Sequence, residues 1–137
     1  MNILQGTIVE IQSSNMVSLI SVDVNGALFS SIILEGKKGR LSYKKGQPVN
    51  VVFKETEVGL AKNLSGLISF RNRFPGTIKT IEKGLVLTKV CLDYRGVNIK
   101  SIISTQSAAD MKLQVNDDVE WLVKTNEVSL MQVPHDV

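Results

Sequence analysis

The chain repeats itself at a fixed offset of 70 residues, and this repeat limits the possible folds more than any other feature. Without gaps, fifteen of the first sixty residues are identical to the residue 70 positions later. The segment GTIVEI at 6–11 matches GTIKTI at 76–81, and KETEVGL at 54–60 matches KTNEVSL at 124–130. Self-similarity at a fixed period is typical of a duplicated structural module.

The duplication predicts two domains, with residues 1–64 as the first repeat and residues 65–137 as the second. Residues 61–70 join the repeats, and Ser65–Gly66 is the expected flexible point of this junction. A module of about 60 residues buries little apolar surface alone, so a second module and association into an oligomer would both stabilise it.

Each repeat is predicted to be a β-structure. Residues 6–11 and 17–24 alternate between apolar and polar side chains with the period of a strand. Asn25–Gly26 then separates 17–24 from 27–33, and Asn-Gly is a strong hairpin signal because both residues tolerate positive φ. Arg95–Gly96 is a weaker form of the same turn in the second repeat.

Two more strands are expected at the end of each repeat, at 47–54 and 57–61 in the first repeat. The resulting count of about five short strands per repeat is that of an OB-like barrel. The predicted fold class is therefore all-β, with two tandem OB-like β-barrel modules.

One segment of the second repeat is predicted to be a short helix. Residues 107–113, SAADMKL, place Ala108 and Met111, with Leu113, on one side of a helix. Ser104 or Thr105 can cap its start. The aligned stretch of the first repeat, residues 35–43, contains glycines and basic residues and has no helix signal, so the repeats differ here.

Composition excludes several functional classes. The net charge is +3, and the basic residues are scattered rather than gathered into a stripe with aromatic platforms, so no nucleic-acid partner is expected. The lone cysteine, Cys91, lies in an apolar run and is expected to be a buried small hydrophobe. His135 lies in the C-terminal tail, where neither a metal ligand nor a catalytic base is expected.

No signal peptide or membrane span is evident from the hydropathy, so a cytoplasmic location without a membrane partner is expected. With one cysteine and one histidine, the usual carriers of nucleophilic and acid–base catalysis do not form a constellation. No catalytic residue, bound metal cation or enzymatic activity is predicted.

Three motifs of the second repeat resemble the Mop module, also called the TOBE or molbindin module. They are ISFRNRFPGTI at 68–78, SIISTQSAADMKL at 101–113 and VEWLVKTNEVSL at 119–130. The family pattern is Ser-Ala-Arg-Asn shortly before Gly-x-Ile or Gly-x-Val, then Ile-Thr-x-x-Ser-x-x-x-Leu-x-Leu, then a lysine at the end of the next strand. Both repeats follow this plan, so the resemblance covers nearly the whole chain.

The resemblance implies a binding site for molybdate or tungstate between modules of different subunits. Ser69, Arg71 and Asn72 match the serine, arginine and asparagine of the first motif, and Phe70 stands where alanine is usual. We call residues 69–72 the opening motif. Ser104 replaces the usual threonine and keeps its hydroxyl, Ser107 matches the serine, and Lys124 matches the lysine. We call Ser104 and Ser107 the hydroxyl pair.

The chemistry of these residues suits a tetrahedral dianion. The hydroxyl pair can donate hydrogen bonds, as can backbone N–H groups at the start of the predicted helix. Lys124 supplies one positive charge, and backbone N–H groups of residues 69–71 could complete the shell from a neighbouring chain. Ordinary structural roles are the alternative: a helix cap for the hydroxyl pair, a solvated strand end for Lys124 and a turn for Arg71–Asn72.

The first repeat lacks most of this constellation. Met1 stands opposite Arg71, Leu34 opposite Ser104 and Lys37 opposite Ser107, and only Lys54 keeps the type of its counterpart, Lys124. The first repeat is therefore not expected to form a site of the same kind. It could line one, or hold a different anion through Lys37, Lys38 and Arg40.

The resemblance favours a non-catalytic protein that binds molybdate or tungstate for storage or homeostasis. In the family such two-repeat proteins assemble as trimers, so a homo-oligomer is expected, a trimer rather than a dimer. The alternative is a molybdate-sensing effector module that acts with a separate partner, since no DNA-binding domain is expected ahead of the first repeat. An OB-type single-strand binder is a third reading, and the few aromatic residues argue against it.

Overall fold

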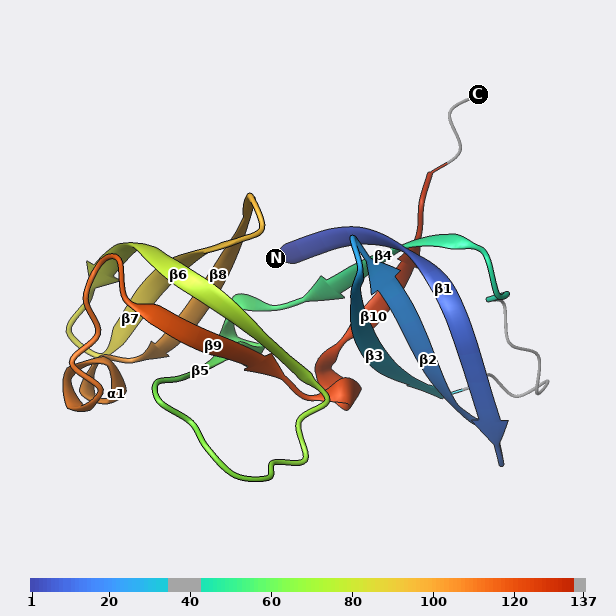
Figure 1. The fold of residues 1–137 in the computed structure, drawn as a ribbon, viewed down its shortest axis with the longest axis horizontal. Helices are drawn as coiled ribbons and strands as arrows, with labels where there is room; N and C mark the ends of the chain where they lie inside the picture. Colours follow the sequence, from blue (N-terminus) through green and yellow to red (C-terminus); the bar gives the residue numbers. More distant parts are fainter. Residues whose placement is uncertain (35–42, 135–137) are drawn as a thin grey trace. The chain divides into compact units, whose positions relative to one another are not determined.

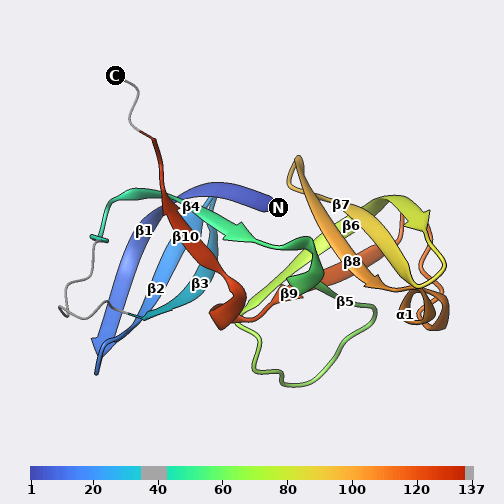
Figure 2. The ribbon, with the colours of Figure 1, turned by 180° about the vertical axis from the view of Figure 1, so that it is seen from behind.

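A computed structural model describes residues 1–34 and 43–134 of the chain. The described part is mostly β-strand, with a short α-helix and two single turns of 3-10 helix (Figures 1 and 2). The strands of the first half and its 3-10 turn are β1 Asn2–Ser14, β2 Val17–Val24, β3 Ala27–Leu34, β4 Pro48–Phe53, η1 Glu55–Glu57 and β5 Gly59–Ala61. The strands, the α-helix and the 3-10 turn of the second half are β6 Asn72–Lys83, β7 Leu87–Tyr94, β8 Val97–Ser104, α1 Thr105–Asp110, β9 Asp118–Val123, η2 Thr125–Glu127 and β10 Ser129–Gln132.

The strands form two five-stranded sheets, and the predicted all-β class with OB-like modules is confirmed. Their strand orders are β10-β4-β1-β2-β3 and β5-β9-β6-β7-β8. The longest strand of each sheet carries an irregularity in register, between Ile8 and Glu10 in β1 and between Ile78 and Thr80 in β6. Bulges of this kind bend a strand and increase its twist, which curls each sheet.

The predicted hairpin turns are confirmed in both sheets. Asn25 and Gly26 have φ values of 51° and 90°, and Arg95 and Gly96 have values of 50° and 84°. Two consecutive residues with positive φ define the turn that matches the twist of the flanking strands. This backbone demand explains why a glycine stands second in both turns.

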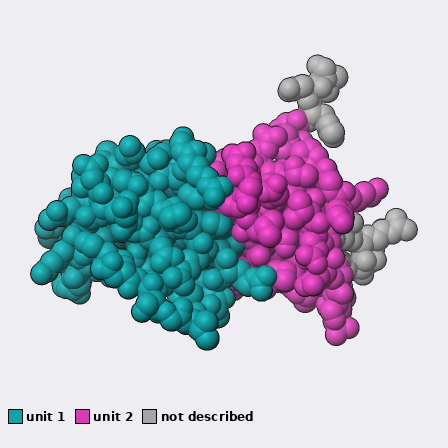
Figure 3. Space-filling model, viewed as in Figure 1, with its two compact units in different colours: residues 1–2, 54–123 teal, residues 3–53, 124–137 magenta. Residues whose placement is uncertain are grey.

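The chain divides into two compact units that do not follow the predicted boundary between the repeats (Figure 3). Unit 1 contains residues 1–2 and 54–123, and unit 2 contains residues 3–53 with the chain from residue 124 onwards. Within unit 1, β5 of the first repeat pairs with β9. Within unit 2, β10 of the second repeat pairs with β4. Each unit is thus completed by the last strand of the other repeat.

A buried serine fixes the incoming segment in each unit. In unit 1 the Ser101 hydroxyl donates to the Val58 carbonyl at 2.7 Å, and in unit 2 the Ser31 hydroxyl donates to the Val128 carbonyl at 2.6 Å. Ser31 and Ser101 occupy equivalent positions of the two repeats, 70 residues apart, and so do Val58 and Val128. Because a buried hydroxyl without a partner is costly, these bonds specify where the incoming segment lies.

The cores of the two units differ in their largest side chains. In unit 1, Trp121 lies against Phe74 and Tyr94, with ring centroids 4.9 Å and 5.2 Å away. The residue 70 positions before Trp121 is Val51, which is also completely buried. Unit 1 therefore has an aromatic cluster around Trp121, whereas unit 2 has a valine at the equivalent position and buries Phe29 and Phe53.

Two predictions about local structure need correction. The helix begins at Thr105 rather than residue 107, because Ser104 caps it, and it ends at Asp110 because Lys112 adopts a positive φ of 51°. Cys91 is half-buried rather than buried, because it alternates along β7 with the buried residues Val90 and Leu92 and so lies on the other face of the strand. Residues 35–42 and His135 lie outside the described residues.

The described part of the chain contains no helix long and apolar enough to cross a membrane.

Candidate functional site

The hydroxyl pair lies at the end of β8, where the chain turns into α1. The Ser104 hydroxyl accepts a hydrogen bond from the Ser107 N–H at 3.0 Å, so Ser104 caps the helix. The same hydroxyl donates to Ser107 Oγ at 2.8 Å. With its own proton used in this way, Ser104 leaves Ser107 as the member of the pair with a proton available for an anion. Both side chains are exposed.

The N–H groups at the start of α1 are less available than the sequence suggests. The Ser107 N–H is bound to Ser104, and the Thr105 N–H donates to the Val86 carbonyl at 2.8 Å. The prediction of unsatisfied donors at this helix start is therefore wrong for these two residues. Hydroxyl chemistry, and not the six-residue helix, is what this position offers an anion.

Thr105 connects the hydroxyl pair to the turn between β6 and β7. Its hydroxyl donates to the Gly84 carbonyl at 2.9 Å and is 2.8 Å from the hydroxyl of Thr88, which is completely buried. Sequence reasoning considered Thr105 only as a cap and missed this role, because its partners lie 17 and 21 residues away. The turn is thereby held beside Ser104.

Beside Ser104 lies a shallow hollow of about 360 Å³, lined by Leu85, Val86, Ser104, Thr105, Gln106 and Ala109. Two of its apolar side chains are largely exposed, Leu85 at 96% and Val86 at 70%, and the adjacent Leu87 is 56% exposed. Contiguous apolar side chains that remain exposed mark a surface that another molecule covers.

The opening motif lies just before and at the start of β6. Ser69 and Arg71 are exposed and Phe70 is half-buried, whereas Asn72 is completely buried and pairs with Val123 in β9. Lys124, which is exposed, follows Val123 directly. The antiparallel pairing of β6 and β9 thus brings Asn72 next to the residue that precedes Lys124.

The structure does not bring the hydroxyl pair and the opening motif together within unit 1. Ser104 of β8 pairs with Leu87 of β7, and the next residue of β7, Thr88, pairs with Lys83. The hydroxyl pair therefore lies at the end of the sheet where β6 ends. Asn72 lies at the other end of β6, and about 35 Å of extended chain separates it from Lys83. The two halves of the predicted constellation therefore lie at opposite ends of one sheet.

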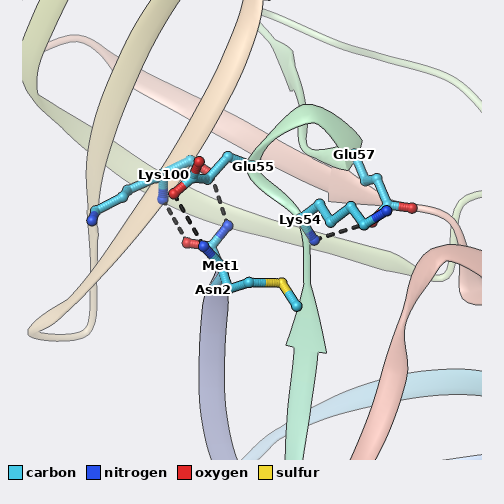
Figure 4. A network of polar contacts seen from close by, with 6 residues as sticks. All are labelled: Met1, Asn2, Lys54, Glu55, Glu57 and Lys100. Carbon is cyan, nitrogen blue, oxygen red and sulfur yellow. Dashed lines mark hydrogen bonds and ion pairs between the residues drawn. The ribbon is translucent and has the colours of Figure 1, made fainter.

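In the first repeat, the Met1 amine, the Asn2 side chain and the Lys54 backbone N–H make local polar contacts (Figure 4). The Asn2 side chain donates to the Lys100 carbonyl and accepts from the Lys100 N–H, both at 2.8 Å. The Met1 amine forms an ion pair with Glu55 at 3.1 Å, and this hydrogen bond lowers the pKa of the Glu55 carboxyl. The Lys54 N–H donates to Glu57 at 3.1 Å.

Of the two first-repeat residues opposite the hydroxyl pair, the structure describes Leu34, whose side chain has no hydrogen-bond donor. Leu34, opposite Ser104, ends β3 and is largely exposed. Lys37, Lys38 and Arg40 lie outside the described residues, so an anion site formed by them stays a prediction.

Residues 68–130 match the TOBE domain family. Over 96% of both chains, with 25% sequence identity and a TM-score of 0.90, the fold matches a crystal structure of the cytoplasmic molybdate-binding protein ModG with molybdate bound. A molybdate-binding protein from Sporomusa ovata is 38% identical, with a TM-score of 0.45, and the match covers 51% of this chain and all of that one.

The molybdenum import ATP-binding proteins ModC of Brucella abortus and Brucella suis are also similar, with 30% identity over 111 residues. That match covers 80% of this chain but only 29% of those proteins. The chain therefore spans about three tenths of the length of these relatives.

The chain is a tandem OB-like all-β protein with two curled five-stranded sheets. Each sheet has its own hairpins and a bulge in its longest strand. Residues 68–130 of the chain belong to the TOBE domain family, and the chain as a whole shares the fold of the molybdate-binding protein ModG.

Proposed function

We propose that this protein binds molybdate or tungstate without catalysis, for intracellular storage or homeostasis in the cytoplasm. The likeness to molybdate-bound ModG across 96% of both chains carries the proposal. The local chemistry supports it, because the hydroxyl pair, Lys124 and the backbone of the opening motif are hydrogen-bond donors, and none is a poised base or nucleophile.

In this proposal Ser107 donates its free hydroxyl proton to an anion oxygen, while Ser104 holds Ser107 in place. Lys124 supplies the charge, and Ser69, Phe70, Arg71 and Asn72 contribute the rest of the shell, largely through backbone N–H groups. Each charge-assisted hydrogen bond of this kind contributes about 1.5–3 kcal/mol.

We also propose that the complete site forms between subunits of a homo-oligomer, a trimer rather than a dimer. The hydroxyl pair and the opening motif lie at opposite ends of the sheet of unit 1, which supports a site that takes them from different copies. The exposed apolar side chains of Leu85, Val86 and Leu87 beside Ser104 support the same idea, because a neighbouring subunit would remove them from water.

Calorimetric titration with molybdate, tungstate and sulfate, together with native mass spectrometry, tests the proposal. Saturable heat with molybdate or tungstate, and none with sulfate, is expected on an oligomer. If neither molybdate nor tungstate gives heat at millimolar concentration, the proposed function is wrong. If binding occurs on a monomer, the site between subunits is wrong and the binding function stands.

Substitutions then test the assignment of residues. Ser107→Ala and Lys124→Ala should each weaken binding by about 1–3 kcal/mol without unfolding the protein. Lys54→Ala is the matched control, because Lys54 occupies the position of Lys124 in the first repeat. If Lys54→Ala weakens binding and Lys124→Ala does not, the assignment to the second repeat is wrong.

A second candidate is a molybdate-sensing module that acts with a separate partner. The similarity to part of the ModC import proteins favours it, because there the matching region belongs to a larger transport protein. Affinity purification with and without molybdate distinguishes the two roles: a sensor retains a partner in a molybdate-dependent way, and a storage protein does not.

A further inference from the structure

We infer that Lys62 is a positioning residue for the hydroxyl pair. This inference rests on the proposed function, because it concerns the same oxyanion site. Lys62 follows β5, the strand that the first repeat contributes to unit 1, and it lies 45 residues before Ser107 in the sequence. It does not belong to the predicted donor set and would act on the anion only through the shape of α1.

The Lys62 ammonium holds the exit of α1 by three hydrogen bonds. Nζ donates to the Met111 carbonyl and the Lys112 carbonyl, both at 3.3 Å, and to Asp117 Oδ2 at 3.0 Å. An ammonium group has three donors, so all of them are used here. The carbonyls at the end of a helix carry partial negative charge and favour a cation at this place.

These contacts connect Lys62 to Ser107 through one backbone link. The Met111 N–H donates to the Ser107 carbonyl at 3.0 Å, and the Met111 carbonyl accepts from Lys62. The helix between them has six residues, which is too short to be stable by itself in water. Fixing its exit therefore fixes the first turn, where the Ser107 side chain is held 2.8 Å from Ser104.

Asp117 makes the far side of the clamp rigid. Its carboxylate accepts from the Gln114 N–H at 2.9 Å as well as from Lys62, and these bonds lower the pKa of Asp117. The adjacent backbone is tied to β6, because the Asn116 N–H donates to the Ile78 carbonyl at 2.8 Å. Lys62 thus connects α1 to a loop that is itself anchored on the sheet.

The equivalent turn of unit 2 is built without this clamp. The residue 70 positions after Lys62 is Gln132, and the counterpart of Asp117 is Gln47, whose side chain accepts from the Lys44 N–H at 3.0 Å. The turn is thus retained with neutral side chains, while the lysine–aspartate clamp occurs in the unit that carries the hydroxyl pair. The first repeat, which lacks a hydroxyl pair, contributes through Lys62 to the one in the second.

The test is a double-mutant cycle on the full chain with molybdate as the probe. Lys62→Ala should weaken binding roughly tenfold, as expected for a partner that orients a ligand-binding group, and Lys62→Arg should restore most of it. In a Ser107→Ala background, Lys62→Ala should change affinity by less than about twofold, because the group it positions is gone. Lys79→Ala, at an exposed lysine of β6, is the matched control.

Each outcome decides the inference. Equal weakening by Lys62→Ala in both backgrounds would show a general structural effect and overturn the positioning role. Unchanged affinity in Lys62→Ala would also overturn it and leave the proposed function intact, whereas absence of molybdate binding in the unmodified protein would overturn both. If Lys62→Ala does not fold, Asp117→Asn removes the charged acceptor of the clamp and is held to the same criteria.

Discussion

Unit 1 and unit 2 have the same β-scaffold but differ in their core and surface side chains. Strands β2 and β7 have the same pattern of burial, as do β4 and β9, and each sheet receives its fifth strand from the other repeat. The shared features are the hairpins, the bulges and the buried serines that bind the backbone of the incoming segment. Duplication therefore preserved what builds a sheet and left the side chains that could bind an anion free to diverge.

The differences gather in unit 1. It has the aromatic cluster around Trp121, the hydroxyl pair, and ion pairs between Lys62 and Asp117 and between Arg73 and Glu120. Arg73 also donates to the Leu64 carbonyl at 3.4 Å and so holds the junction between the repeats. Unit 1, which carries the hydroxyl pair and the opening motif, thus also has the buried tryptophan and more ion pairs among the described residues.

The largest expected difference lies in the cores. Trp121→Ala should lower the free energy of unfolding by about 3–5 kcal/mol, because it removes the centre of the aromatic cluster and leaves a cavity. Val51→Ala, the matched change in unit 2, should cost about 2 kcal/mol, because fewer buried atoms are lost. Denaturant unfolding followed by circular dichroism measures both. Equal losses would mean that the aromatic cluster adds nothing beyond the shared scaffold.

The next effect concerns the contribution of the first repeat to unit 1. Asn2→Ala should destabilise the protein by about 2–3 kcal/mol, because two hydrogen bonds to the Lys100 backbone are lost in a buried place. Asn98→Ala, at an exposed asparagine of β8, is the control and should change stability by less than about 0.5 kcal/mol. A loss in Asn2→Ala no greater than in the control would show that Asn2 is not needed to complete unit 1.

A smaller and symmetrical effect is expected at the two anchoring serines. Ser101→Ala and Ser31→Ala should each cost about 1–2 kcal/mol, because each leaves the carbonyl of the incoming segment without its buried donor. Thermal unfolding of the two variants should give similar losses. A large loss in one variant only would mean that the strand from the other repeat stabilises the two units unequally. The two scaffolds would then not be equivalent.

The sequence predicted the individual strands of this fold and missed their exchange. Alternation and the turns at Asn25–Gly26 and Arg95–Gly96 are local signals, and they place β2, β3, β7 and β8 closely. The 70-residue offset, however, is the same whether β5 and β10 pair with their own repeat or with the other one. Only the tertiary contacts, such as those of Ser31 and Ser101, distinguish the two arrangements.

The candidate site was predictable as a set of residue types and not as a geometry. The spacing of Ser104 and Ser107 indicates a cap with hydroxyls, and the structure has that cap. Nothing in the sequence indicates that the opening motif lies at the other end of the sheet, since this follows from the register of β6 and β7. Lys62 was missed for a related reason, because its partners are about 50 residues away and its own segment has no motif.

The smallest expected effect is on the response to acid. Lys62 and Arg73 lower the pKa of Asp117 and Glu120 in the folded protein, mainly through side-chain hydrogen bonds. A lowered folded pKa contributes stability that is present above the unfolded pKa and is lost as the pH falls through the folded value. The melting temperature should therefore fall as the pH drops below the ordinary carboxyl range. The contribution is small, because both pairs are partly exposed and screened by water.

Substitution of single carboxylates compares the acid response of the two units. Asp117→Asn and Glu120→Gln should each make the melting temperature less dependent on pH in that acid range, because the group whose pKa differs between states is gone. Glu10→Gln, at an exposed glutamate of β1 in unit 2, serves as the control. If Glu10→Gln flattens the profile as much as the unit 1 variants do, the charged restraints are not a distinguishing feature of unit 1. Molybdate affinity separates the two variants. If Asp117→Asn reduces the affinity and Glu120→Gln does not, the Lys62–Asp117 pair contributes to both acid stability and anion binding, whereas Glu120 contributes to stability only.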